Sequence, residues 1–405
     1  MKFNRNLVIL FATLVIMMIG FGIIIPILPF YVESMGGSGL AMGLLMAIYS
    51  LMQFLFSPVW GGLSDRFGRK PILIVGVFGN AITMILLGLS DSLPMLLTMR
   101  GLAGVLSSAT LPTAYAFISD STDEKNRGGG MGIVGAAMGL GMVLGPSIGG
   151  VFAKVSPQAP FYIAGGLSFL AVIAIWLFLP ESFPHEKRSH GVRLQGPQLN
   201  MMWKALFGEA GFLFFTAFMI SFAITNFEGI FPFYAQQRYN FDEFTVGMIL
   251  TTVGTISFIV QGGLTGIATR KLGDAWVIKA SLIASAAGFF VMILAKDLAG
   301  VLVTSGFFVL SNAMLRPAVS SQISKQADMP QGLAMGLNNA FMSLGRVMGP
   351  LWAGWVIDID LTYPFSTGAV IMLLGFIASL FFLKGGALPA ESHPEAEAVS
   401  TSSTD

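Results

Sequence analysis

The sequence predicts an all-α polytopic membrane protein, with twelve transmembrane helices in two pseudo-symmetric six-helix bundles. Three observations support this fold class: the composition, the succession of long apolar segments and an internal repeat. The chain has 405 residues, of which 54% are hydrophobic and 11% charged, with a mean hydropathy of +0.77. Soluble domains carry about 25% charged residues. A helix needs about 20 apolar residues to cross about 30 Å of hydrocarbon, so twelve spans use most of this length.

The composition also limits the function. A net charge of +1 gives no indication of a nucleic-acid partner. With no cysteine, the chain has neither disulfides nor a thiol nucleophile, and the three histidines, His185, His190 and His393, fall in polar segments. The sequence contains no Ser-His-Asp arrangement, metal cluster or phosphate loop. We therefore expect a protein that is not an enzyme, that binds no cofactor or metal, and that is a monomer in the lipid bilayer.

The apolar segments fall into two groups of six. The first group is expected at 7–30, 40–60, 71–90, 93–118, 131–153 and 160–180, and the second at 211–235, 244–268, 277–295, 298–323, 333–356 and 365–384. The first segment is too long for a cleaved signal peptide and lacks a small-residue cleavage site, so we interpret it as a span.

These segments divide the chain into four parts. Residues 1–180 form an N-terminal bundle, 181–209 a charged cytoplasmic linker, 210–386 a C-terminal bundle and 387–405 a disordered tail. With the N-terminus inside, sixteen Lys and Arg residues lie on the cytoplasmic side and three on the outer side. The positive-inside rule then places both termini in the cytoplasm.

The two halves repeat each other. Three patterns of the first half recur in the second at offsets of 201, 204 and 205: Gly61-Gly62-Leu63 with Arg69-Lys70, Gly141-x-Val143-x-Gly145-Pro146, and the segment around Pro112. Matches at nearly one offset indicate duplication. Two parallel six-span halves around a midplane site are an architecture in which one half rocks against the other to alternate access.

The segment GGLSDRFGRKPIL, residues 61–73, joins two apolar segments. Its charged side chains cannot lie in lipid, and Gly68 allows the backbone to turn with positive φ, so the segment must be a tight loop at the membrane surface. The spacing G-x-L-x-D-R-x-G-R-[KR] resembles the loop between the second and third spans of the major facilitator superfamily. In that family the loop pairs with an acid at the end of the fourth span. The resemblance thus implies a cytoplasmic gate of Asp65, Arg66, Gly68, Arg69 and Asp120.

The predicted span 131–153 contains small residues at four-residue spacing and a proline that bends it. This chemistry alone indicates close helix packing. Its order G-x-x-x-G-P-x-x-G-G also matches the antiporter motif of the family, which is seen in exporters, so Gly145 and Pro146 are implied gating residues. Outside the linker and the tail, the chain resembles bacterial 12-span multidrug/proton exporters, the group that includes quinolone efflux pumps.

Glu228 is the carboxylate placed well inside a predicted span, whereas the other acids lie in loops, at span ends or in the tail. Residues spaced i, i+4, i+7 and i+11 form one stripe that must face the protein interior: Ser221, Thr225, Glu228 and Pro232. Burial disfavours the ionised carboxylate, so Glu228 can load and release a proton as water access alternates. The ionised form can attract a cationic substrate, and this competition gives an antiport mechanism. The alternative is a Glu paired with Arg100 or Arg316 for helix packing only.

The remaining candidates are Arg100, linked to proton coupling by its resemblance to the family motif R-x-x-x-G, and a set of mid-span substrate contacts. Each of these contacts alone fits packing as well as binding: Tyr49, Gln53, Met138, Phe227, Arg316, Asn338, Phe341 and Met342. The sequence departs from its relatives at Ala313, where they carry an acid, and at Arg346, where they carry a smaller polar residue. Both changes make the cavity less anionic, which counts against dicationic substrates and favours neutral or zwitterionic ones.

The resemblance implies a proton-driven exporter of amphipathic drugs or metabolites in the bacterial cytoplasmic membrane, with a role in antibiotic resistance. Two alternatives stay open. One is a narrow exporter for a tetracycline-like compound, a phenicol-like compound or a metabolite, and the other is a membrane receptor that keeps the fold without transport.

Overall fold

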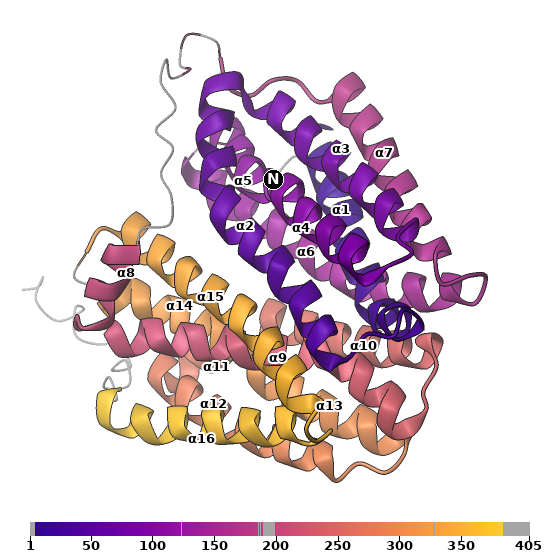
Figure 1. The fold of residues 1–405 in the computed structure, drawn as a ribbon. Coiled ribbons are helices and arrows are strands. Elements are labelled where there is room, and N and C mark those ends of the chain that lie inside the picture. Colours follow the sequence, from indigo (N-terminus) through magenta and orange to yellow (C-terminus); the bar gives the residue numbers. More distant parts are fainter. Residues whose placement is uncertain are drawn as a thin grey trace, which may run out of the picture.

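The computed structural model describes residues 5–122, 124–184, 186, 188, 199–326 and 329–383, and the side chains of all of these except residues 5 and 124–131. The predicted tail, 387–405, lies outside this range. The first half contains α1 (Arg5–Ser34), α2 (Gly39–Phe67), α3 (Arg69–Gly88), α4 (Leu93–Ser107), α5 (Thr110–Ser121), α6 (Glu124–Ala153) and α7 (Ala159–Phe178). Figure 1 shows these helices as one bundle, packed against a second bundle formed by the rest of the chain.

The second half repeats this order. It contains α9 (Gly211–Tyr239), α10 (Glu243–Ile259), a π-helical turn (Val260–Leu264), α11 (Thr265–Leu272), α12 (Asp274–Ile293), α13 (Leu298–Ala313), α14 (Leu315–Gln326), α15 (Gln331–Ile357) and α16 (Tyr363–Phe382). Eleven stretches of the described chain are long and apolar enough to cross a membrane. The predicted span at 333–356 corresponds to α15, which is 27 residues long but carries several polar side chains. The all-α, two-bundle fold class is confirmed.

Two spans are broken at equivalent places. The fourth span divides into α4 and α5 between Ser107 and Thr110, and the tenth divides into α13 and α14 at Met314. Pro112 and Pro317 follow these breaks, within the first turn of the new helix, where a proline costs no intrahelical hydrogen bond. The repeated proline seen in the sequence therefore marks a repeated helix break.

Close helix crossings also repeat. A Cβ on Gly145 of α6 would lie 2.7 Å from the Cα of Gly22 on α1, and a Cβ on Gly345 of α15 would lie 2.7 Å from the backbone nitrogen of Phe222 on α9. The small residues therefore allow backbone to meet backbone, as the spacing predicts. The α1–α6 pair of the first half has the same packing as the α9–α15 pair of the second.

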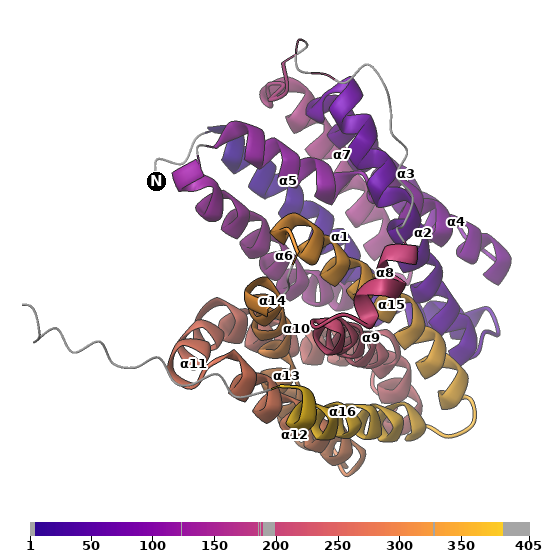
Figure 2. The same ribbon diagram turned by 90° about the vertical axis from the view of Figure 1, so that its left-hand side faces the viewer.

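The two halves meet where α2 packs on α15 and α6 packs on α10 (Figures 1 and 2). At the predicted outer face, the two carboxylate oxygens of Asp358 accept hydrogen bonds from the backbone N–H groups of Gly39, at 2.8 Å, and Leu40, at 2.9 Å. Asp358 thus caps the first turn of α2 from the opposite half. Ser147 and Thr251 hydroxyls, also in the outer part of their spans, form a further bond between the halves at 2.5 Å.

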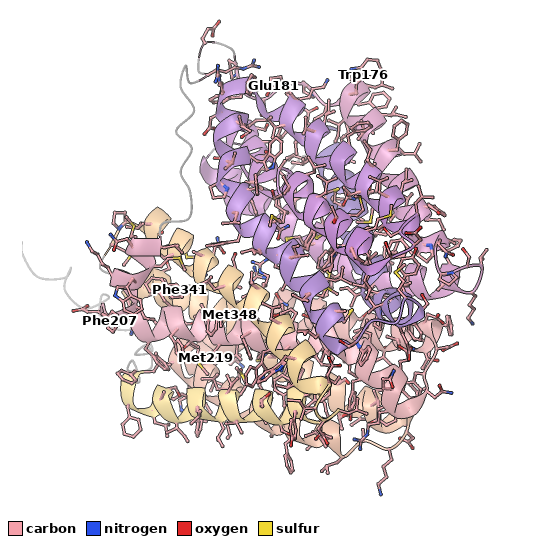
Figure 3. All side chains as sticks on the ribbon, in the orientation of Figure 1. Trp176, Glu181, Phe207, Met219, Phe341 and Met348 are labelled. Carbon is pink, nitrogen blue, oxygen red and sulfur yellow. The ribbon has the colours of Figure 1, made fainter. Side chains whose placement is uncertain are left out.

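The predicted linker contains a short helix, α8 (Leu199–Leu206), in addition to irregular chain. Met202 and Ala205 are buried against the second half, whereas Trp203 and Phe207 are exposed and pack edge to face. Figure 3 places Phe207 at the end of the bundle, beside α8. Glu181, at the start of the linker, lies at the corresponding end of the first half.

Candidate substrate and proton site

Glu228 lies in the middle of α9, a helix that is mostly buried because it contacts both bundles. Its side chain is partly exposed, whereas Phe227 beside it is fully buried against Phe231 and Phe308. The predicted stripe faces the protein interior, since Ser221 is buried and the Thr225 hydroxyl lies 3.3 Å from the carbonyl oxygen of Gly345. The α9–α15 crossing therefore holds Glu228 at the centre of the molecule.

Two arginines of the second half act on the charge of this carboxylate. Arg316 on α14 and Arg346 on α15 both interact electrostatically with Glu228. Both also interact with Tyr115, which belongs to α5 of the first half and is 39% exposed. Arg316 is exposed as well, although it lies inside a span. Because these groups come from opposite halves and face one another, they line the space between the two bundles.

Arg100 on α4 forms a second polar centre in the first half. Its guanidinium lies 4.3 Å from the ring centre of Tyr49, whose hydroxyl is 3.0 Å from the Ser107 hydroxyl. The side-chain amide of Gln53 lies 3.5 Å from the same Tyr49 hydroxyl. These residues line a cavity of about 20 Å³ that also includes Thr110. The structure therefore brings together three of the residues singled out in the sequence: Tyr49, Gln53 and Arg100.

The other predicted substrate contacts are divided between the site and the packing core. Asn338 and Met342 on α15 line a narrow crevice with Arg316. Phe341 stacks on Phe214 at a ring separation of 5.6 Å and is almost fully buried. Figure 3 shows Phe341 and Met348 one above the other along α15. Phe227 lies in an aromatic core, and Met138 packs against the core of the first half.

The loop after α2 contains an ion-pair cluster centred on Arg69. Gly68 has φ of +103°, and the buried Arg69 bonds the carboxylates of Asp65 at 2.6 Å and Asp120 at 2.9 Å. Arg66 is exposed and stays outside the cluster, with its guanidinium over the ring of Phe67. Glu181 completes the cluster, since its carboxylate accepts a bond from the Arg69 backbone N–H at 2.9 Å.

The second half carries the same cluster with the charges exchanged. Asp274 begins α12 after Gly273, which has φ of +81°, and its buried carboxylate accepts a bond from Lys325 at 2.6 Å. Arg69 and Asp120 lie 205 residues before Asp274 and Lys325. No motif or spacing in the sequence singled out Glu181, Asp274, Tyr115 or Asp358. The offset of 205, applied to the ends of the spans, could have identified Asp274 and Lys325.

The fold and this site together define a class of protein. Two pseudo-symmetric bundles of membrane helices enclose a polar, ionisable centre between them, which is the arrangement of a secondary transporter. The sequence profile of the Major Facilitator Superfamily matches residues 10–328 and, in a second match, residues 213–403. The chain belongs to this superfamily, whose members are transporters and not enzymes.

Relatives of known name cover nearly the whole chain. The chain is 31% identical to Multidrug resistance protein 1 of Bacillus subtilis over 94% of its own length and 96% of the relative's. It is 27% identical to the Quinolone resistance protein NorA of Staphylococcus aureus, over 93% of this chain and 96% of the relative.

Solved structures share the fold. An inward-facing bacterial homologue of the lysosomal transporter Spinster matches with a TM-score of 0.73 at 17% identity, over 96% of this chain and 100% of that one. The nucleoside transporter NupG matches with a TM-score of 0.75 at 14% identity, over 94% of this chain and 100% of that one.

Proposed function

We propose that this protein is a proton-coupled efflux transporter that exports amphipathic small molecules by alternating access. The observation that carries the proposal is the position of Glu228, a mid-span carboxylate beside Arg316 and Arg346 in the space between the halves. The relatives are a multidrug resistance protein and a quinolone resistance protein, which supports drugs as cargo. The export direction rests on the resemblance of the α6 residues to the antiporter motif, whereas their packing on α1 accounts for the glycines alone.

Glu228 performs two functions in this scheme. Water reaches it from one side of the membrane at a time, so it binds a proton from the outside and releases it inside. Its proton changes the charge next to Arg316 and Arg346, which alters the affinity of the site for cargo. The cycle therefore needs no cofactor, and the proton gradient supplies the energy.

The ion-pair clusters at the predicted cytoplasmic face contribute to gating by bracing each half internally. With the termini in the cytoplasm of a bacterial cell, the bonds of Asp358 to α2 close the outer face, and the structure corresponds to an inward-facing state. The Arg69 and Asp274 clusters each hold the spans of one half together at the cytoplasmic face. Each half can then move as a rigid body during the cycle.

The experiment that tests this proposal measures proton release from energised inverted vesicles after ethidium, a fluoroquinolone or a phenicol is added. We expect proton release with several compounds for the wild type, and none for Glu228→Gln, although binding persists. Release with one chemical class only would establish a narrow exporter. Proton release that is unchanged in Glu228→Gln would show that another residue carries the proton. If no compound caused proton release, the receptor with this fold would be the remaining interpretation.

A further inference from the structure

Arg100 is a buried cation that has no acidic partner among the described residues. Its side chain is 0% exposed, and its Nε and Nη1 atoms have no hydrogen-bond partner there. The Nη2 atom reaches only the sulfur of Met46, at 3.8 Å. None of the ion pairs in the described part of the chain involves Arg100. A buried charge is costly unless an opposite charge or hydrogen bonds compensate it, so this guanidinium group still needs a partner.

Two aromatic rings cover part of the guanidinium group without neutralising it. Its central carbon, Cζ, lies 4.3 Å from the ring centre of Tyr49 and 5.9 Å from that of Phe21. The face of an aromatic ring attracts a cation, but it carries no net charge and does not replace a hydrogen-bond acceptor for the N–H groups. The free donors of Arg100 therefore need an acceptor that these rings do not supply.

The cavity that Arg100 lines can hold one small guest. It lies entirely within the first half, because all of its lining residues belong to α1, α2, α3, α4 and α5. Its volume of about 20 Å³ exceeds the ~10–15 Å³ that one water requires. Two of its lining residues, Phe21 and Gln53, are partly exposed, so the lining is not closed to solvent. The cavity therefore admits a guest close to the size of a water molecule and excludes a drug.

The polar groups around this cavity supply donors but no negative charge. The Thr110 hydroxyl is buried and, like Arg100, has no hydrogen-bond partner. The side-chain amide of Asn80 donates one hydrogen to Ser168, at 2.9 Å, and has a second hydrogen to donate. No Asp or Glu is among the described residues that line the cavity. Free donors around a guanidinium group favour an anion over a cation as the guest.

We propose that this cavity binds a single chloride ion, held by the free N–H donors of Arg100, with the Thr110 hydroxyl as a further donor. Chloride is only slightly larger than a water molecule, and it accepts hydrogen bonds from any direction. Its charge neutralises the buried guanidinium group, which a water molecule cannot do. Polyatomic anions such as sulfate or phosphate are too large for the cavity. Because the site lies within one half, the ion is a structural ligand of that half and not the exported cargo.

The test measures thermal unfolding of the purified full-length protein in detergent. Sodium gluconate, whose anion is too large for the cavity, is replaced stepwise by sodium chloride at constant pH and ionic strength. A ligand that binds only the folded protein raises the melting temperature, so we expect a saturating rise of about 2–4 °C. Bromide should replace chloride. In crystals grown with bromide, we expect an anomalous scattering peak beside the guanidinium group of Arg100.

Substitutions remove the cation or supply the anion. Arg100→Gln removes the buried charge and should abolish the rise in melting temperature. Gln53→Glu keeps Arg100 and adds a carboxylate to the lining of the same cavity, so its melting temperature should no longer depend on chloride. Gln331→Glu is the matched control and should keep the full rise, because Gln331 is exposed at the start of α15 and does not line this cavity. Because Gln53→Glu retains the arginine, the test stands even if Arg100→Gln fails to fold.

Three results would overturn the proposal. Equal melting temperatures of the wild type in chloride and gluconate would leave water as the guest of the cavity. A full rise with chloride in Gln53→Glu would show that chloride acts on the protein as a whole. A bromide peak found only away from Arg100 would place the anion site elsewhere. None of these measurements involves transport, so the chloride site is tested independently of the proposed export function.

Discussion

The contact between α2 and α15 at the predicted outer face gives a prediction about the conformational equilibrium. A Cβ on Gly43 would press on the carbonyl oxygen of Pro350 and would lie 3.1 Å from the Cα of Gly354. Carbon atoms at optimal separation are about 3.5–4.0 Å apart, and backbone atoms in a helix cannot turn aside. Gly43→Ala therefore forces the outer ends of the halves apart by at least about 0.4 Å while the outer face is closed.

The strain exists only in the closed arrangement, because the two backbones separate when the outer face opens. Overpacking of this kind costs about 1–3 kcal/mol. An energy difference of about 1–3 kcal/mol between two states changes their ratio by about 5- to 150-fold. Gly43→Ala should therefore shift the population from the state with a closed outer face towards the state with an open one.

The chain has no native cysteine, so spin labels can be attached at Leu89→Cys and Leu294→Cys. These leucines are 56% and 61% exposed at the outer ends of α3 and α12, one in each half. Electron–electron distance measurements should show a longer component that grows in Gly43→Ala. Gly61→Ala is the matched control, since Gly61 lies on the same helix and a Cβ there meets nothing within 4 Å. Unchanged distances in Gly43→Ala, or an equal change in Gly61→Ala, would refute the reasoning.

Two further predictions concern the ends of the spans. Asp274→Asn should lower the free energy of unfolding by about 1–2 kcal/mol, since a buried carboxylate loses charged bonds to Lys325 and Ser321. Lys325→Gln should cost less, because Lys325 is 65% exposed, and thermal unfolding in detergent that shows equal costs would contradict this. Asp242, the N-cap of α10, bonds Thr245, which lowers the pKa of its carboxyl. Its contribution of about 0.5 kcal/mol should be present above pH ~4 and be lost as the pH falls through that lowered pKa. An unfolding profile of Asp242→Ala that matches the wild type at neutral pH would count against the cap.

The sequence was sufficient to predict the architecture because membrane physics acts locally. Apolar length, basic loops and a repeated pattern determine that the chain crosses the bilayer many times as two similar halves. Gly68 and Arg69 could also be placed at a surface turn, because charge and backbone freedom leave few other positions. For the same reason Glu228 could be singled out, since a carboxylate inside a span is rare and costly.

Contacts between distant segments could not be predicted in this way. Nothing near Asp358 in the sequence indicates that it caps α2, more than 300 residues earlier. Phe227 and Glu228 are neighbours in the chain, yet the tertiary packing buries one in an aromatic core and leaves the other beside two arginines.

The sequence alone thus predicted the succession of spans, their duplication and the type of residue at the centre. These follow from the free energy of transferring each side chain into the membrane, which depends mainly on the side chain itself. Only the tertiary structure decided which arginines interact with Glu228, that Arg100 has no acidic partner among the described residues, and that Asp358 joins α15 to α2. Those properties depend on how the helices are rotated and crossed, and therefore on packing between residues that lie far apart in the chain.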